Sequence, residues 1–395
     1  MKVLFLIRDL PYPPTTGCQK RNFYLLKELA MKGAEIILFC ENSSVKVIDV
    51  PAEIKQLTKN INFITVDPKK HIKRNIFSLF SPLPFWVKAR TSVKVRNAIN
   101  DYVHKNHVDM IICDSIYRAL NIPFKNTTYK ILYEHNIESM IIKRYIETET
   151  SLFWKFLASV EFLKLKWFQK KMWKQFDCCV VCSLLDKVFI RKSIGSEKNV
   201  CVIGNGVDTL FFNPNARTME EDTLVYTGLI GWHPNEDAIL YFVNNVYPLI
   251  KKQRSSIKFF IVGEKPSKII KELAQKDNSI TVTGFVDDVR PYMGKASVFI
   301  VPLRIGSGTR LKILEALSME KAVVSTSVGC EGLEVENNKH LLIRDNPADF
   351  AQAVIALLND ENLRVQLGKN GRALVEARYT WDKVFDALSE ILKCK

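Results

Sequence analysis

The sequence predicts an α/β chain with two doubly wound, parallel-sheet domains, and three observations lead to this. Its 395 residues exceed what one hydrophobic core usually serves. Short β-rich runs alternate with helical patterns in two separate series. The turn-rich segment Gly204-Asn205-Gly206-Val207-Asp208 lies between the series. We therefore expect one domain at residues 1–205, a second at 206–375, and a closing helix at 376–395 that could pack on the first domain.

The first series opens with the apolar run Val3–Ile7, which ends in a loop rich in proline and glycine. A helical pattern follows at Arg21–Lys32 and is closed by Gly33, before a second strand at Glu35–Cys40. This order of strand, glycine loop, helix and strand is typical of the beginning of a doubly wound sheet. Further buried strands are expected at Ile61–Val66, Met110–Cys113, Lys130–Tyr133 and Cys178–Cys182.

The second series repeats this alternation after residue 222. Its expected helices are Asn235–Ile250 and Ile269–Gln275. Its expected strands are Leu224–Gly228, Lys258–Gly263, Ile280–Gly284, Val298–Pro302 and Ala322–Thr326. Open α/β sheets bind ligands at the carboxyl ends of their strands. In this sequence several of these strands end in Gly or Pro beside small polar residues.

Composition favours a soluble globular enzyme, with 47% apolar and 25% charged residues. No apolar run is long enough to span a bilayer, and the first residues do not resemble a signal peptide. The nine cysteines are scattered without the paired spacing of a zinc site, so we expect buried, reduced thiols in a cytoplasmic chain.

Positive charge is confined to the first half. Residues 1–205 hold 33 Lys and Arg against 18 Asp and Glu, a difference of +15, whereas residues 206–395 hold 24 of each. Lysines and arginines alternate with aromatic side chains at residues 69–96 and again at 153–176. This composition suits an anionic membrane surface. The alternative is a pair of core-facing segments whose lysines are simply solvated.

The richest candidate site follows the expected strand Val298–Pro302. Gly306, Ser307 and Gly308 form a tight turn, and an amphipathic helix is expected to start near Thr309. Glycines let backbone amides approach an anion, and a helix N-terminus presents unpaired N–H groups. Basic residues are unfavourable at such a terminus unless an anion lies there. Arg310 and Lys312 therefore predict a phosphate site, and Glu315 supplies a carboxylate for sugar hydroxyls.

These motifs together resemble family 4 of the retaining glycosyltransferases, in particular bacterial sugar transferases of exopolysaccharide systems. The resemblance covers nearly the whole chain and rests on the segments 13–17, 134–138, 205–208, 227–228, 262–264, 283–288 and 308–331. It implies the GT-B fold, in which two Rossmann-like domains face each other across a cleft. It also implies a nucleotide-sugar donor in the C-terminal domain and a glycan or lipid-linked acceptor in the N-terminal domain.

The resemblance also implies roles for individual donor residues. Glu315 matches the second of the family's two glutamates, which lies on the nucleotide ribose, whereas Ser307 stands where the first is usual. The sugar contacts would then fall to Ser307, Thr309 and backbone amides. The family's basic pair after the first C-terminal strand is missing, because Gly228 and uncharged residues stand there.

Arg310 and Lys312 are therefore the best candidates to neutralise the donor's diphosphate. Gly263 and Val286 are implied to lie beside the nucleobase, and Gly17 is implied to bring its backbone close to the diphosphate and acceptor.

His135 follows the expected strand Lys130–Tyr133 at its carboxyl end. The residues alone favour a structural histidine in a polar loop, but the resemblance reverses this interpretation, because it implies a contact with the donor sugar. The resemblance further implies a front-side mechanism in which the departing diphosphate takes the acceptor proton. No Asp-x-Asp arrangement occurs, and Asp287-Asp288 is interpreted as a helix cap, so we expect no catalytic metal and no cofactor besides the nucleotide sugar.

Two other functions fit parts of the sequence. The basic first half could bind nucleic acid, although no recognised nucleic-acid motif occurs and we expect none as a partner. A GT-B-shaped epimerase or hydrolase would use the same donor site without an acceptor. We expect instead a transferase of cell-surface polysaccharide synthesis, cytoplasmic and peripheral on the inner face of the plasma membrane.

Overall fold

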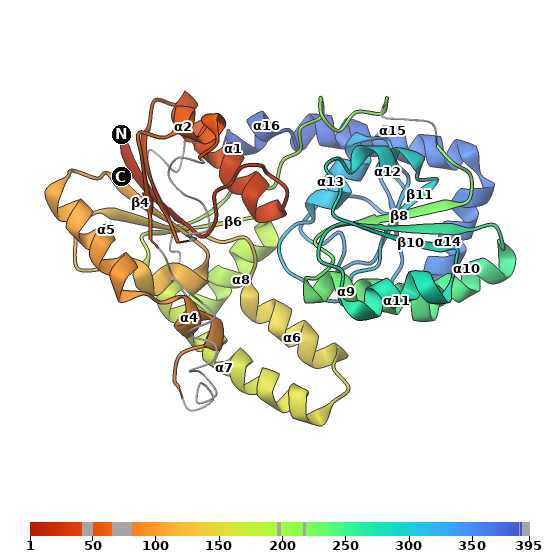
Figure 1. Ribbon diagram of the computed structural model, residues 1–395, viewed down its shortest axis with the longest axis horizontal. Helices are drawn as coiled ribbons and strands as arrows, with labels where there is room; N and C mark the ends of the chain where they lie inside the picture. The colour runs from red at the N-terminus through yellow and green to blue at the C-terminus, as the bar shows by residue number, and fades with distance from the viewer. Residues whose placement is uncertain (42–49, 65–80, 196–198, 216–218, 387, 389–395) are drawn as a thin grey trace. The chain divides into compact units, whose positions relative to one another are not determined.

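The computed structural model describes residues 1–41, 50–64, 81–195, 199–215, 219–386 and 388, in two compact units (Figure 1). Unit 1 comprises Met1–Ile203 together with Phe385–Lys395, and unit 2 comprises Gly204–Val384. The chain thus passes from one unit to the other within the turn-rich segment expected at the boundary. Each unit is described by itself below.

Unit 1 is built on a seven-stranded sheet in the order β3-β2-β1-β4-β5-β6-β7, with every neighbouring pair parallel. Its strands are β1 (Lys2–Ile7), β2 (Glu35–Cys40), β3 (Asn60–Phe63), β4 (Met110–Asp114), β5 (Tyr129–Tyr133), β6 (Cys178–Val181) and β7 (Val200–Val202). The strand order reverses between β1 and β4, which is the place where doubly wound sheets bind ligands.

Helices cover both faces of this sheet. They are α1 (Gly17–Met31), α2 (Ala52–Leu57), α4 (Phe85–Arg90), α5 (Val93–Lys105), α6 (Glu138–Thr148), α7 (Leu152–Gln175) and α8 (Leu184–Ile194), with a 3₁₀ turn at Ile116–Asn121. Helix α1 begins four residues before the position expected from its periodicity. Its Thr16 and Gln19 form a capping box that the apolar pattern alone does not show.

Unit 2 is built on a six-stranded parallel sheet in the order β10-β9-β8-β11-β12-β13. Its strands are β8 (Thr223–Thr227), β9 (Lys258–Val262), β10 (Ile280–Gly284), β11 (Val298–Val301), β12 (Val323–Ser325) and β13 (Leu342–Ile343). Here the order reverses between β8 and β11, so the loops after β8, β9 and β11 lie at one edge of the sheet.

The helices of unit 2 are α9 (His233–Tyr241), α10 (Tyr247–Gln253), α11 (Lys268–Lys276), α12 (Arg290–Lys295), α13 (Leu311–Ser318), α14 (Pro347–Asn359) and α15 (Glu361–Arg378). The long helix expected at Asn235–Ile250 is divided, because a π turn at Phe242–Val246 separates α9 from α10. The closing helix is described only as α16 (Trp381–Phe385), and α15 extends past the expected boundary at residue 375. In the described part of the chain, none of the helices has the length and apolarity needed to cross a membrane.

Candidate functional site

Two glycines meet at the carboxyl edge of the second sheet. Gly228 follows β8 with φ +155°, and Gly263 follows β9 with φ +146°. A Cβ atom at Gly263 would overlap the carbonyl oxygen of Gly228, and Gly228 N donates to Val262 O at 3.0 Å. Because no larger residue fits this approach, only glycine lets the two loops come so close together at the strand ends.

Lys312 reaches this glycine pair from the first turn of α13. A Cβ atom at Gly228 would lie only 2.9 Å from Lys312 Nζ. The ammonium donates to Asn235 Oδ1 at 3.1 Å and lies 3.8 Å from the ring centre of Tyr226. Burial lowers the pKa of Lys312 well below its ordinary value, and nearby Arg310 lowers it further, while Glu315 raises it. Within the described part of the chain, Lys312 therefore has no anionic partner that offsets its burial.

Arg310 closes the turn that precedes α13. Its guanidinium donates to the carbonyl oxygens of Ser307 and Gly308, the second at 2.8 Å, and it fills the space that a Cβ atom at Gly306 would need. Arg310 is the N-cap residue of α13 but gives it no side-chain cap, so the helix begins two residues after the expected Thr309. Arg310 thus stabilises the turn and holds its positive charge against the carbonyl oxygens of that turn.

The remaining predicted donor residues lie in the same loops or close to them. Thr309 is held by Asn205, whose Nδ2 donates to Thr309 O at 3.1 Å and to Oγ1 at 2.7 Å. Glu315 is buried on α13, and Val286 packs against the apolar cluster that includes the buried side chains of α13. Asp288 accepts a hydrogen bond from Arg290 N at 2.9 Å just before α12, but the N-cap residue of that helix is Val289, which has no side-chain cap.

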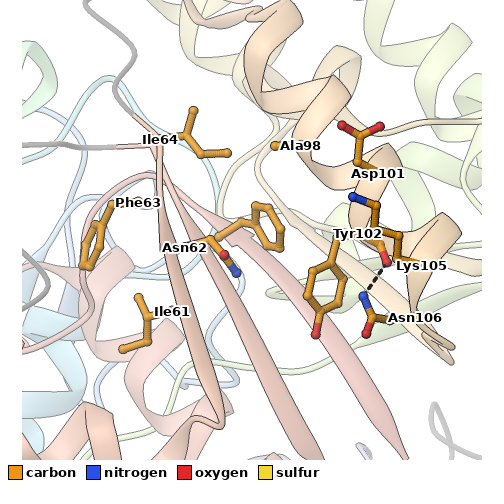
Figure 2. Close-up of a pocket in the computed structure, with 10 residues that line it drawn as sticks. Ile61, Asn62, Phe63, Ile64, Ala98, Asp101, Tyr102, Lys105 and Asn106 are labelled. Carbon is orange, nitrogen blue, oxygen red and sulfur yellow. Dashed lines mark hydrogen bonds between the residues drawn. The ribbon is translucent and has the colours of Figure 1, made fainter.

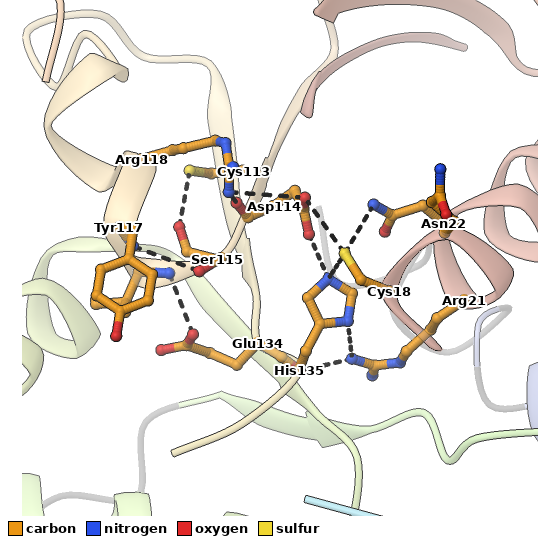
Figure 3. Close-up of polar contacts among 12 residues, drawn as sticks. Cys18, Arg21, Asn22, Cys113, Asp114, Ser115, Tyr117, Arg118, Glu134 and His135 are labelled. Carbon is orange, nitrogen blue, oxygen red and sulfur yellow. Dashed lines mark hydrogen bonds and ion pairs between the residues drawn. The ribbon is translucent and has the colours of Figure 1, made fainter. Parts of the chain in front are cut away.

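In unit 1, His135 lies at the carboxyl end of β5 in a cluster of polar side chains (Figure 3). Its Nε2 is hydrogen-bonded to Asp114 Oδ1 and lies 3.3 Å from Cys18 Sγ. Asp114 ends β4, and Cys18 follows Gly17 in the first turn of α1. The structure therefore brings the start of α1, where Gly17 lies, next to His135 through the contact of Cys18.

Arg21 fixes the tautomer of His135. Its Nη1 donates to Glu134 O at 2.5 Å and lies 3.4 Å from His135 Nδ1. Because a guanidinium can only donate, Nδ1 accepts and Nε2 carries the proton toward Asp114. Burial would raise the pKa of Asp114, but His135 and Arg118 lower it below its ordinary value. Asp114 is therefore a carboxylate that orients the histidine ring.

Cys18, Asp114 and His135 form a set of metal-ligand types, all within 4.8 Å of one another, that the sequence spacing does not show. The neighbouring groups do not favour a cation. Arg21 lies at His135 Nδ1, and Arg118 Nη1 lies 3.8 Å from Asp114 Oδ2. Since hydrogen bonds already engage the ligand atoms and two guanidinium groups lie beside them, we interpret the set as a hydrogen-bonded cluster.

Comparison with known proteins connects these sites to a family. Residues 221–360, most of unit 2, match the family described as glycosyl transferases group 1. The chain is a glycosyltransferase, and its residues 221–360 carry the group 1 match. An uncharacterised 44.6 kDa protein from the cps region of Klebsiella pneumoniae is 23% identical over 98% of both chains.

A Mycobacterium tuberculosis GDP-mannose-dependent α-(1-6)-phosphatidylinositol monomannoside mannosyltransferase is 27% identical to this glycosyltransferase. That alignment covers 48% of this chain and 54% of the relative. The solved sucrose-phosphate synthase from Thermosynechococcus elongatus has a TM-score of 0.75 at 18% identity, covering 100% of this chain and 98% of that one. The structural likeness confirms the predicted GT-B fold, with its two Rossmann-like domains.

Sequence reasoning missed several residues that shape the glycosyltransferase's sites. Asp114 could have been found, since it ends a strand beside the one that carries His135. Cys18 was expected to be buried with the other cysteines, but it is exposed, unlike the other described cysteines. Asn235 and Tyr226, which position Lys312, carried no signal because they lie 77 and 86 positions before it.

An open pocket of about 410 Å³ lies elsewhere in unit 1, between α5 and strands β2 and β3 (Figure 2). Tyr102, Lys105, Asn106 and Phe63 are among the residues that line it. None of the residues predicted for donor or acceptor binding lines this pocket. The basic segment Lys69, Lys70, Lys73 and Arg74 lies outside the described residues.

Proposed function

We propose that this glycosyltransferase moves a sugar from a nucleotide-sugar donor to a glycan or lipid-linked acceptor, with retention at the anomeric carbon and without a divalent metal. The product would enter a cell-surface polysaccharide. We also propose that the enzyme works as a peripheral protein on the inner face of the plasma membrane. A separate basis supports each part.

The observation that carries the donor proposal is the convergence of Gly228, Gly263 and Lys312 at one sheet edge, beside the turn braced by Arg310. The two glycines bring their loops together at the strand ends, and Lys312 there offers a desolvated ammonium to an anion. Glu315, one turn further along α13, is proposed to bind the ribose hydroxyls. Val286 and Gly263 are proposed to flank the nucleobase.

The proposed step balances without a metal. The bond between the anomeric carbon and the diphosphate oxygen breaks, and the acceptor oxygen forms the new bond on the same face of the sugar. The acceptor's hydroxyl proton passes to the leaving diphosphate, whose charge Lys312 and Arg310 stabilise. In this proposal Lys312 is the main group that stabilises the charge of the leaving diphosphate, and Arg310 adds positive charge from the turn before α13.

His135 and Gly17 are proposed to complete the site from unit 1, on the sugar and acceptor side. Both ring nitrogens of His135 are engaged within that unit. A contact with the donor sugar therefore requires that Nε2–H be shared with a sugar oxygen in place of Cys18 or Asp114. Asp114 is a positioning residue for this contact.

The relatives support the substrate classes. The Klebsiella relative comes from a cps region, and the mycobacterial relative is named for a GDP-mannose donor and a phosphatidylinositol acceptor. A lipid-linked acceptor also agrees with the excess of positive charge before residue 206.

Calorimetry of ligand binding tests the donor site. Lys312→Met is expected to weaken a nucleoside diphosphate at least about tenfold more than the bare nucleoside, because charge-assisted bonds are the strong ones. Glu315→Gln is expected to weaken both ligands, because both carry the ribose. Lys258→Met is the control, since Lys258 is exposed at the amino end of β9. Equal losses for both ligands in Lys312→Met would remove Lys312 from the diphosphate site.

A further inference from the structure

Helix α7 exposes an unusual number of large apolar side chains. Between 55% and 82% of the surface of each lies open in Leu152, Phe153, Trp154, Phe156, Leu163 and Trp167. Scattered single apolar residues are normal on a protein surface, but six on one helix are more than scatter and raise the question of an interaction site.

The spacing shows that the helix has two apolar faces. Leu152, Phe156, Leu163 and Trp167 recur at intervals of four, seven and four, which places them on one side of α7. We call this side the outer face. The opposite side is the ordinary core side, where Leu165, Phe168, Met172 and Trp173 are buried. The core thus accounts for only one of the two apolar faces.

Positive charge continues the outer face toward the C-terminal end of α7. Lys166, Lys170 and Lys171 are exposed and form no ion pair among the described residues. The helix has six lysines and a single acid, Glu161, whose Oε1 accepts from Phe85 N at 2.5 Å on the other side. Lys171 Nζ lies 5.2 Å from the ring centre of Trp167, so cation and aromatic ring share this face.

The position of α7 in unit 1 makes the outer face accessible. Helices α6 and α7 pack together as a hairpin that extends away from the sheet, as Figure 1 shows. The exposed apolar residues begin at Leu152, in the turn of the hairpin, whereas Gln175 leads directly into β6. The exposed apolar residues therefore lie toward the end of α7 that is remote from β6 in the sequence.

We propose that the outer face of α7 docks on an anionic lipid bilayer, with Leu152, Phe156, Leu163 and Trp167 among the acyl chains and lysines at the phosphate headgroups. Amphipathic helices with aromatic and Leu side chains beside lysines bind membranes in this way. A second copy of this chain fits less well, because protein interfaces are depleted in Lys and a twofold pairing would bring like charges together. The inference deepens the proposed lipid-linked acceptor, since it holds unit 1 at the surface where that acceptor lies.

Flotation with phosphatidylglycerol/phosphatidylcholine vesicles tests the docking. The wild-type chain is expected to float with these vesicles, to bind phosphatidylcholine vesicles much less, and to lose affinity as salt is added. Changing Lys166, Lys170 and Lys171 together to Gln should lower the partition coefficient about fivefold per lysine at low salt. The matched control changes Lys252, Lys271 and Lys369 of unit 2, which are also exposed and unpaired among the described residues, and should bind as wild type.

The apolar part has its own variant. Phe156→Gln, Leu163→Gln and Trp167→Gln together should reduce binding at least about tenfold even at high salt, since apolar insertion is not screened. Leu249→Gln, Ile269→Gln and Val365→Gln, three exposed apolar positions of unit 2, are the control. In the unmodified sequence, acyl-chain bromines should quench tryptophan fluorescence, and Trp167→Phe should remove part of that quenching.

Three outcomes would overturn the docking proposal. They are flotation that does not depend on anionic lipid, no flotation at all, and a dimer that the apolar variant dissociates without any vesicle binding by the wild type. Nucleoside diphosphate affinity of each variant, measured without vesicles, separates this from the donor proposal. Unchanged nucleotide affinity with lost flotation supports docking, whereas flotation without nucleotide binding would leave docking intact and contradict the donor site.

Discussion

Lys312 shows how much the proposed donor site depends on single residues. The basic pair that the resemblance implies after β8 is absent, yet an ammonium lies at that place, because Lys312 reaches Gly228 from α13. Glycine at position 228 makes the approach possible, since a Cβ atom there would meet Lys312 Nζ at 2.9 Å. The cation therefore comes from a different element, but it lies at the same strand end.

The lowered pKa of Lys312 gives a pH-dependent prediction. A bound diphosphate would raise the pKa that burial and Arg310 hold down, so binding should take up a proton. Affinity is then fully present below the pKa of the free enzyme and is lost as pH rises through the pKa of the complex. Calorimetry at pH 8 in buffers of different ionisation enthalpy measures the uptake. The second phosphate pKa of about 6 is already passed at this pH.

The wild-type chain is expected to take up protons when it binds a nucleoside diphosphate, and Lys312→Met none. The bare nucleoside is the matched ligand and should cause no uptake in either protein. Proton uptake that persists in Lys312→Met would assign the titration to another group.

At the scale of elements, the long buried strands and the strand-end glycines could be predicted, but short edge elements could not. Strands β7 and β13 have three and two residues, too few for a periodic pattern. The π turn between α9 and α10 leaves the apolar spacing nearly unchanged, so the sequence suggests one helix. The sequence did not decide whether residues 153–176 form a core helix or a membrane-binding helix. Helix α7 has one apolar face in the core and another in solvent, so the apolar pattern fits both interpretations.

Helix α7 is tied to the end of β5 by a buried carboxyl group. Trp173 Nε1 donates to Glu134 Oε1 at 3.0 Å, and Ile116 N donates to Oε2 at 3.2 Å. Burial raises the pKa of Glu134 to about 8, although these two hydrogen bonds act to lower it. The folded state therefore holds a proton that the unfolded chain releases at much lower pH.

This contact predicts a change of stability with pH. The contribution of Glu134 is fully present below its ordinary pKa and is lost as pH rises through about 8, at roughly 1.4 kcal/mol per unit. Glu134→Gln does not titrate. The substitution itself changes the stability by an amount that does not depend on pH. The unfolding midpoint of the variant minus that of wild type should therefore increase from pH 5 to pH 8.5. A difference that stays constant over this range would contradict the raised pKa.

At the scale of the whole molecule, the division of labour follows charge. Unit 2 carries balanced charge and the proposed donor site in loops at one sheet edge, whereas the excess of +15 lies before residue 206. Gly228, Gly263 and the turn before α13 were predictable because strand-end glycines are local features. The cluster of Cys18, Asp114 and His135 was not, because 96 and 21 positions separate its members and only the sheet order joins them.

The central claim is transfer of a sugar from a nucleotide donor, and analysis of the product tests it most directly. The enzyme is incubated with a panel of nucleotide sugars, a membrane extract containing lipid-linked glycans, and excess chelator, and NMR gives the anomeric configuration of the new linkage. The proposal predicts a glycoside with the configuration of the donor, formed despite the chelator and lost in Lys312→Met. Free sugar or an epimerised nucleotide sugar as the only product, or consumption of no donor in the panel, would contradict it.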